Sequence, residues 1–157
     1  MKSYLVAAAL LFGPAGSPAM AAPLACPDLA TAVQVGNCPD EQELRYSFVA
    51  HCSDNARLYN PDALCEDFER YRRQKNVALW EAGDGSFQAY LSCDLPVAVI
   101  KAATASNIAL TRQGRVTRVV CRYQEGIAFT YRAKGTCRVQ GNGDCAGNLA
   151  ACKATCD

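Results

Sequence analysis

Apolar and polar residues alternate from residue 115 to residue 133, which is typical of a β-hairpin with one buried face. A three-residue loop over residues 124–126 gives a wholly apolar face if Gly126 takes the left-handed conformation of a G1 bulge. The expected cross-strand pairs on this face are Tyr123 with Ile127, Cys121 with Phe129 and Val119 with Tyr131.

The polar face of the same hairpin is rich in arginine. A two-residue loop would place Arg122 opposite Phe129 and mix charge into the apolar face, so the alternation selects the bulged register. That register sets Arg118 directly opposite Arg132, with Arg122 further along the same strand.

Two further strand pairs are expected from the same alternation. A type I′ turn at Asp84-Gly85 joins residues 77–82 to 86–93. A two-residue turn at Gln113-Gly114 joins a strand over residues 108–112 to the central hairpin. The expected pairs are Trp80 with Ala89, Ala78 with Leu91, Ile108 with Val119 and Leu110 with Thr117.

The N-terminal third has a helical pattern. Pro-Asp follows Cys26, Cys38 and Asn60, and each instance predicts a helix start because the first turn accepts Pro and favours Asp. The first helix is expected to end near Gly36. A capping box of Asp40 with Glu43 supports the second helix, and Leu64, Phe68 and Tyr71 share a face of the third.

Residues 95–106 fit a strand or a helix opened by Pro96, and the helix is preferred. In the cysteine-rich C-terminal tail, Cys145, Cys152 and Cys156 share one stripe of an expected short helix. The expected fold is therefore α+β, with N-terminal helices packed on an antiparallel meander of about five strands.

Residues 1–21 have the charged, apolar and small-residue regions of a secretory signal peptide, with cleavage expected after Ala21. Residues 22–157 are then expected to form one disulfide-stapled domain, because a chain of this length builds a single core. No later segment approaches the roughly 20 apolar residues of a membrane span, so we expect no membrane insertion.

All ten cysteines lie in the expected mature chain. An even, dense set of this kind after a signal peptide predicts five disulfides in a secreted or periplasmic protein, with the connectivity left open. The cysteines are Cys26, Cys38, Cys52, Cys65, Cys93, Cys121, Cys137, Cys145, Cys152 and Cys156.

The sequence offers little for catalysis or cofactors. The chain has no C-x-x-C pair and only one histidine, His51, so we expect no metal site. No phosphate-binding motif is present and the net charge is +1, so we expect neither a cofactor nor a nucleic-acid partner. Carboxylate-dependent hydrolysis remains an alternative, through Glu66 with Glu69 or Glu81 with Asp84.

Charge is unevenly distributed along the chain. Residues 22–70 hold nine acids and three arginines, whereas residues 112–138 hold seven basic residues and one acid. Two readings follow for Arg118, Arg122 and Arg132: the protein's own acidic helices cover them, or a carboxylate-bearing partner binds them. Tyr90 and Tyr123 would add aromatic anchors if they are exposed.

The second reading leads to the expected function. It is a secreted or periplasmic, non-enzymatic domain of the inhibitor, immunity or envelope-assembly type, whose partner is another protein with an acidic surface. The binding residues would be Arg118, Arg122, Arg132, Tyr90 and Tyr123. The alternatives are a small extracellular hydrolase that uses carboxylates and a structural envelope component. Oligomeric state is left open.

Overall fold

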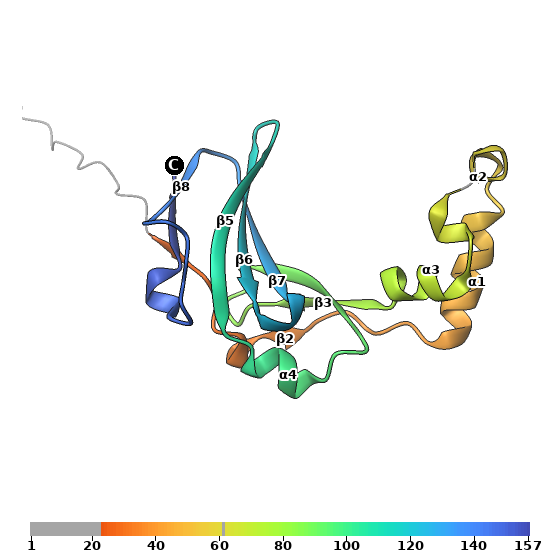
Figure 1. Ribbon diagram of the computed structural model, residues 1–157, viewed down its shortest axis with the longest axis horizontal. Coiled ribbons are helices and arrows are strands. Elements are labelled where there is room, and N and C mark those ends of the chain that lie inside the picture. Colours follow the sequence, from red (N-terminus) through yellow and green to blue (C-terminus); the bar gives the residue numbers. More distant parts are fainter. Residues whose placement is uncertain (1–22, 61) are drawn as a thin grey trace, which may run out of the picture.

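The computed structural model describes residues 23–60 and 62–157, so the predicted signal peptide lies outside the described residues. Figure 1 shows two lobes. The sheet lobe comprises residues 23–37 and 77–157, and the helical lobe comprises residues 38–76. The fold is α+β, as expected, but its strands form two sheets rather than one meander of about five strands.

The two lobes contain the following elements. The α-helices are α1 (Glu41–Cys52), α2 (Asn55–Tyr59), α3 (Phe68–Lys75) and α4 (Val97–Ala102), and the 3₁₀ helices are η1 (Leu29–Thr31), η2 (Ala63–Cys65), η3 (Gln124–Gly126) and η4 (Leu149–Ala151). The strands are β1 (Leu24–Ala25), β2 (Val33–Gln34), β3 (Val77–Glu81), β4 (Gln88–Ser92), β5 (Ala105–Gln113), β6 (Val116–Tyr123), β7 (Ala128–Ala133), β8 (Cys137–Val139) and β9 (Lys153–Cys156).

The larger sheet has the order β2-β3-β4-β7-β6-β5, and the smaller has the order β1-β9-β8. Every pairing is antiparallel. The larger sheet consists of two well-paired halves, because β4 and β7 share a single aligned pair, Gln88 with Thr130.

The central hairpin, β6 and β7, has the predicted register. Cys121 lies opposite Phe129, and Arg118 lies opposite Arg132. Gly126 has the expected positive φ of 70°, but Glu125 also has a positive φ, of 56°. The alternation of side chains therefore determined the pairing correctly, although it did not reveal the conformation of Glu125.

Both neighbouring turns differ from the prediction. The hairpin of β5 and β6 turns at Gly114-Arg115, so Ile108 pairs with Cys121 instead of Val119. The error is two residues, an even number, and every side chain keeps its predicted face.

The pairs of β3 with β4 are as predicted, but the turn between these strands is not type I′. The amide of Gly85 donates to the carbonyl of Ala82 at 2.8 Å. Of the two expected turn residues, Gly85 alone has positive φ, whereas a type I′ turn requires it at Asp84 too.

Each Pro-Asp site places its aspartate before a helical turn. Asp28 caps η1, Asp40 caps α1 and Asp62 caps η2, each by accepting a backbone N–H bond. Asp40 and Glu43 form the predicted capping box. The first helix ends at Thr31 rather than near Gly36, and the predicted third helix is divided into η2 and α3.

Leu29 of η1 and Ile100 of α4 join the core beside the larger sheet, but α1 and α3 do not cover this sheet, and this overturns the expected layer of N-terminal helices. Instead α1 packs on α3 and η2 within the helical lobe. Its small core centres on Leu44 and Tyr71, with Phe48 in edge contact with Phe68 and Tyr71 at centroid distances of 5.7 and 5.3 Å. These short helices therefore bury their apolar faces against one another and not against the sheet.

All ten cysteines are paired, which confirms the predicted disulfide framework. The bridges are Cys26–Cys121, Cys38–Cys93, Cys52–Cys65, Cys137–Cys156 and Cys145–Cys152. Five bridges in one chain fit an extracellular or periplasmic protein.

The C-terminal tail is not the predicted helix. Cys152 ends a loop that begins at Cys145, and Cys156 lies in strand β9 opposite Cys137. Inside the predicted helix, Ala146 and Gly147 have positive φ values of 45° and 75°, which a continuous helix does not allow. By contrast, residues 97–102 form the predicted helix α4.

Candidate functional site

One face of the larger sheet packs in the core and the other is open. Val119, Cys121 and Phe129 point into the core, each at 0% exposure. We name as the open face the opposite side of β3, β4, β6 and β7, on which no side chain is buried. It consists of Val77, Leu79, Glu81, Gln88, Tyr90, Ser92, Val116, Arg118, Val120, Arg122, Ala128, Thr130 and Arg132.

A cleft of about 300 Å³ opens on this face where the two halves of the sheet meet. Three of the five predicted binding residues line it: Arg118, Arg132 and Tyr90. Tyr90 is 72% exposed. Gln88 and Thr130, which the sequence analysis did not single out, also line the cleft and add polar groups. The sequence signal that could have found them is the alternation of exposed and buried residues along β4 and β7, which puts Gln88 and Thr130 on the open face.

The other two predicted residues lie elsewhere. Arg122 is exposed on the open face outside the cleft, where its Nη1 donates to Oδ1 of Asn107 at 3.1 Å. Tyr123 is 4% exposed, and its hydroxyl donates to the carbonyl of Pro27 at 2.6 Å. Burial also raises the pKa of Tyr123. Tyr123 is therefore a core residue and not a surface anchor.

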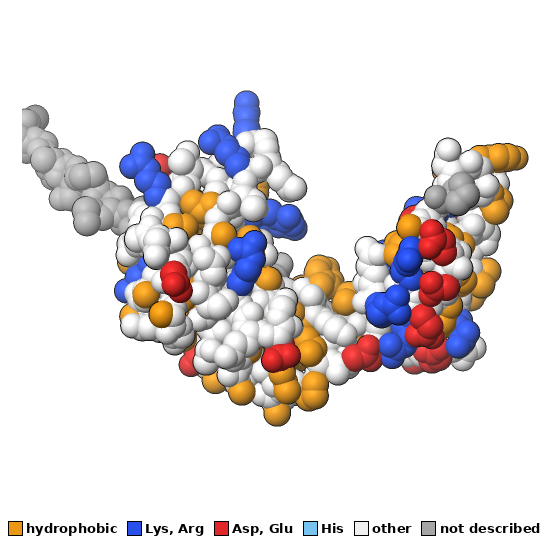
Figure 2. Space-filling model, in the orientation of Figure 1, with side chains coloured by type: hydrophobic (Ala, Val, Ile, Leu, Met, Phe, Trp, Pro, Cys, Tyr) orange, Lys and Arg blue, Asp and Glu red, His pale blue; other side chains and the backbone are white. Residues whose placement is uncertain are grey.

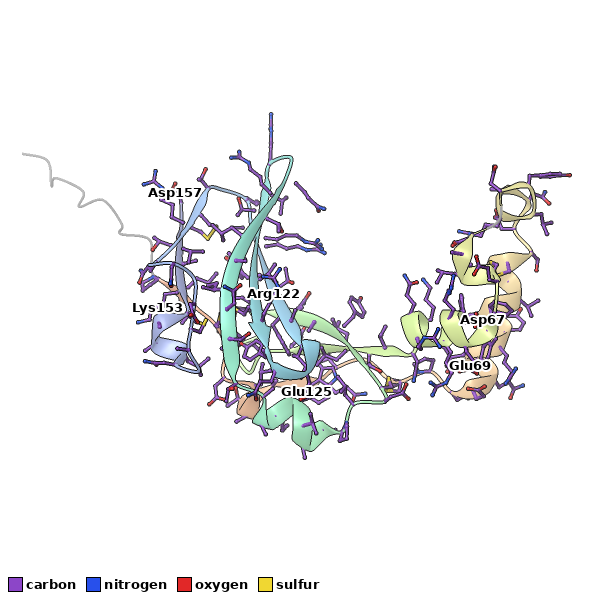
Figure 3. All side chains as sticks on the ribbon, in the orientation of Figure 1. Asp67, Glu69, Arg122, Glu125, Lys153 and Asp157 are labelled. Atoms are coloured by element: carbon purple, nitrogen blue, oxygen red, sulfur yellow. A yellow bond between two sulfur atoms is a disulfide. The ribbon has the colours of Figure 1, made fainter. Side chains whose placement is uncertain are left out.

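The acidic residues of the helical lobe do not reach the arginines. Figure 3 shows Asp67 and Glu69 in that lobe, far from Arg122 on the sheet. Acids of the helical lobe pair with arginines of the same lobe: Arg70 pairs with Glu66 at 2.6 Å, and Arg72 pairs with Glu41 at 3.5 Å. Within residues 23–60 and 62–157, none of Arg118, Arg122 and Arg132 pairs with a carboxylate.

Figure 2 shows Lys and Arg side chains on the sheet lobe where it borders the hollow between the lobes. On the central hairpin, two like charges directly opposite each other destabilise the sheet. The Arg118–Arg132 pair is therefore a local cost to stability that a bound carboxylate would offset.

Three of the four carboxylates named for hydrolysis have local partners instead. Glu66 pairs with Arg70, and Glu81 accepts a bond of 2.9 Å from Gln88. Hydrogen bonds from Ser86 lower the pKa of Asp84, whereas a general acid needs a raised pKa.

The single histidine has a structural setting. His51 lies 3.2 Å from Asp62, next to the Cys52–Cys65 bridge that joins the same two elements. The amide of Leu64 and the side chain of His51 lower the pKa of Asp62. Among the described residues, no group of three or more His, Cys, Asp or Glu side chains is placed to hold a metal ion.

Comparison with protein-family models, curated proteins and solved structures found no match to this chain. Over residues 23–60 and 62–157, no helix has the length and apolar character required to cross a membrane.

Removing the opposed charges tests the electrostatics of the cleft. Replacing Arg118 and Arg132 with Gln should leave the free energy of unfolding unchanged or raise it by up to about 1 kcal/mol, the scale of a cross-strand pair. As a control, Arg70→Gln breaks the pair with Glu66 and should lower stability by about 0.3–0.5 kcal/mol. Urea unfolding measures both, and a clear loss in the double variant would show that the arginines have an internal partner.

Proposed function

We propose that this chain is a secreted or periplasmic, non-enzymatic protein-binding domain of the inhibitor, immunity or envelope-assembly type. The observation that carries the proposal is the cleft in which Arg118 and Arg132 lie opposite each other beside exposed Tyr90. Arginine binds carboxylates in a bidentate manner, and Arg and Tyr are enriched among the residues that dominate binding energy at interfaces.

The size of the cleft supports a protein partner. A volume of about 300 Å³ is at the lower end of the range for small-molecule sites. It suits one or two side chains that project from a partner, with the carboxylate of one between the two guanidinium groups. The surrounding open face supplies further contact area.

The test is a pull-down from the native envelope fraction with the oxidised mature protein as bait. The double variant Arg118→Gln, Arg132→Gln should lose the retained protein, with a slower association rate and a weaker dependence on salt. The double variant Arg112→Gln, Arg138→Gln is the matched control, because it removes two exposed arginines that do not line the cleft. A protein retained equally by all three baits would refute the proposal.

A further inference from the structure

Within residues 23–60 and 62–157, no layer of helices covers the open face of the larger sheet. A sheet with one face in the core usually carries helices on the other face or exposes a polar surface there. Here α1, α2 and α3 lie in a separate lobe, and α4 lies beside η1. The open face is not uniformly polar, and its composition indicates what covers it.

On the half of the open face that β3 and β4 form, and on the adjoining edge strand β2, several apolar side chains lie beside the polar Glu81, Gln88 and Ser92. The amide of Val35, just past the end of β2, donates to the carbonyl of Leu79 at 2.9 Å, and Leu79 lies opposite Tyr90. Val33 pairs with Glu81 on the same side of the sheet. Val33, Val35 and Tyr90 are 48%, 50% and 72% exposed. We name Val33, Val35, Leu79 and Tyr90 the apolar band.

The other half of the open face, on β6 and β7, is basic. Arg118 and Arg122 are four residues apart on β6, and Arg132 faces Arg118 from β7. The cleft lies between this half and the apolar band, because Tyr90 and Arg132 both line it. A partner seated on the face therefore meets aliphatic and aromatic surface on one side and guanidinium groups on the other.

We infer that the open face receives an amphipathic helix of the partner protein, with an apolar ridge on the apolar band and carboxylates along the adjacent edge. This inference rests on the proposed function and names the partner's binding element. The charge pattern supports it, because the arginines have no carboxylate partner in the described parts of the chain.

The spacing of the arginines also fits a helix that lies along the strands. Four residues of strand β6 separate Arg118 from Arg122, a distance of about 13 Å at roughly 3.3 Å per residue. Helical acids seven or eight residues apart are separated by about 10.5–12 Å along the axis and lie on the same side of the helix. Such a helix would occupy the layer that the protein's own helices leave empty.

The test uses three acetylated, amidated helical peptides of one length. The first carries a leucine ridge next to a ridge of glutamates seven residues apart. The second has the same composition, with the glutamates on the side of the helix opposite the leucines. The third has glutamine in place of the glutamates. The first should bind the oxidised protein at least tenfold more tightly than either of the others, measured by fluorescence anisotropy.

Protein variants then locate the binding. Val33→Thr with Val35→Thr should weaken binding of the first peptide about fivefold, because it removes apolar contact worth about 1 kcal/mol. Val97→Thr with Val99→Thr is the matched control, since it changes two exposed valines on α4 and should alter affinity less than twofold. Arg118→Gln with Arg132→Gln should weaken binding about tenfold or more.

The outcomes separate the two proposals. Equal binding of the first two peptides, or no peptide binding at all, overturns the helix inference, whereas the proposed function stands if the pull-down still depends on the arginines. Insensitivity of peptide binding to the valine variants overturns it in the same way. Loss of dependence on the arginines in both assays refutes both. If phosphatidylglycerol vesicles bind the open face in place of the peptide, the partner is a membrane surface and the helix inference fails.

Discussion

Replacing Cys26 and Cys121 with alanine should lower the free energy of unfolding by about 4.7 kcal/mol, more than the loss of any other bridge. The chain-entropy account of disulfides scales with the length of the closed loop, and this bridge spans the largest separation of the five, 95 residues. Both cysteines are buried, at 4% and 0% exposure, so the loss of packing adds to the effect.

The bridge within the helical lobe is the control. Cys52 and Cys65 are 13 residues apart, and replacing both with alanine should cost about 3 kcal/mol on the same account. Urea unfolding with matched slopes measures the two losses. Equal losses would contradict a loop-entropy origin for the difference.

Replacing Phe129 with alanine should cost about 3–5 kcal/mol, the usual range for a buried aromatic side chain. Phe129 is fully buried on β7, and its ring lies edge-on to that of Tyr123 at a centroid distance of 6.1 Å. Tyr90→Ala, which truncates an aromatic side chain on the open face, should change stability by less than about 0.5 kcal/mol. Thermal and urea unfolding of both variants would check the assignment of faces, and comparable losses would contradict it.

The buried faces of the main strands could be predicted from the sequence, although their arrangement in two sheets could not, because the alternation of apolar and polar residues is local to each strand. Alternation fixed which side of β6 and β7 is buried, and one apolar register was available for the pair. The turn before β6 was placed one residue early, yet the faces of Ile108 and Leu110 were unaffected because the resulting shift in register is even. The prediction of buried faces was therefore correct despite the misplaced turn, whereas the prediction of individual residue pairs was not.

The placement of the helices could not be predicted because an amphipathic helix specifies an apolar contact but not its partner. The N-terminal helices were expected to pack on the sheet, but α1, which carries Leu44, packs on α3, which carries Tyr71. The opposite charges of the two halves of the chain suggested mutual neutralisation. The acids instead pair with nearby basic residues, as Glu66 does with Arg70, four residues further along the chain.

The candidate site was predicted only in part, because alternation assigns each side chain to a face of the sheet but does not determine which strands meet. Arg118, Arg132 and Tyr90 lie together because strand parity placed them on one face. Tyr123 was assigned to the hairpin's apolar face and also named as a surface anchor, and the structure shows the first to be correct. The cleft itself depends on how β4 meets β7, a pairing between strands far apart in the sequence for which neither strand carries a local signal.

The helical lobe lies within one connection between neighbouring strands, and the length of such a connection can vary. β2 and β3 are antiparallel neighbours, and the 42 residues between Gln34 and Val77 are, for the sheet, a single hairpin connection. Connections of this kind tolerate large changes in length, because each doubling costs only about 0.6 kcal/mol of closure entropy. The Cys38–Cys93 bridge fastens this connection to the turn that directly follows β4. A chain in which a short turn replaces residues 38–76, with Cys93 changed to alanine, would retain the whole cleft.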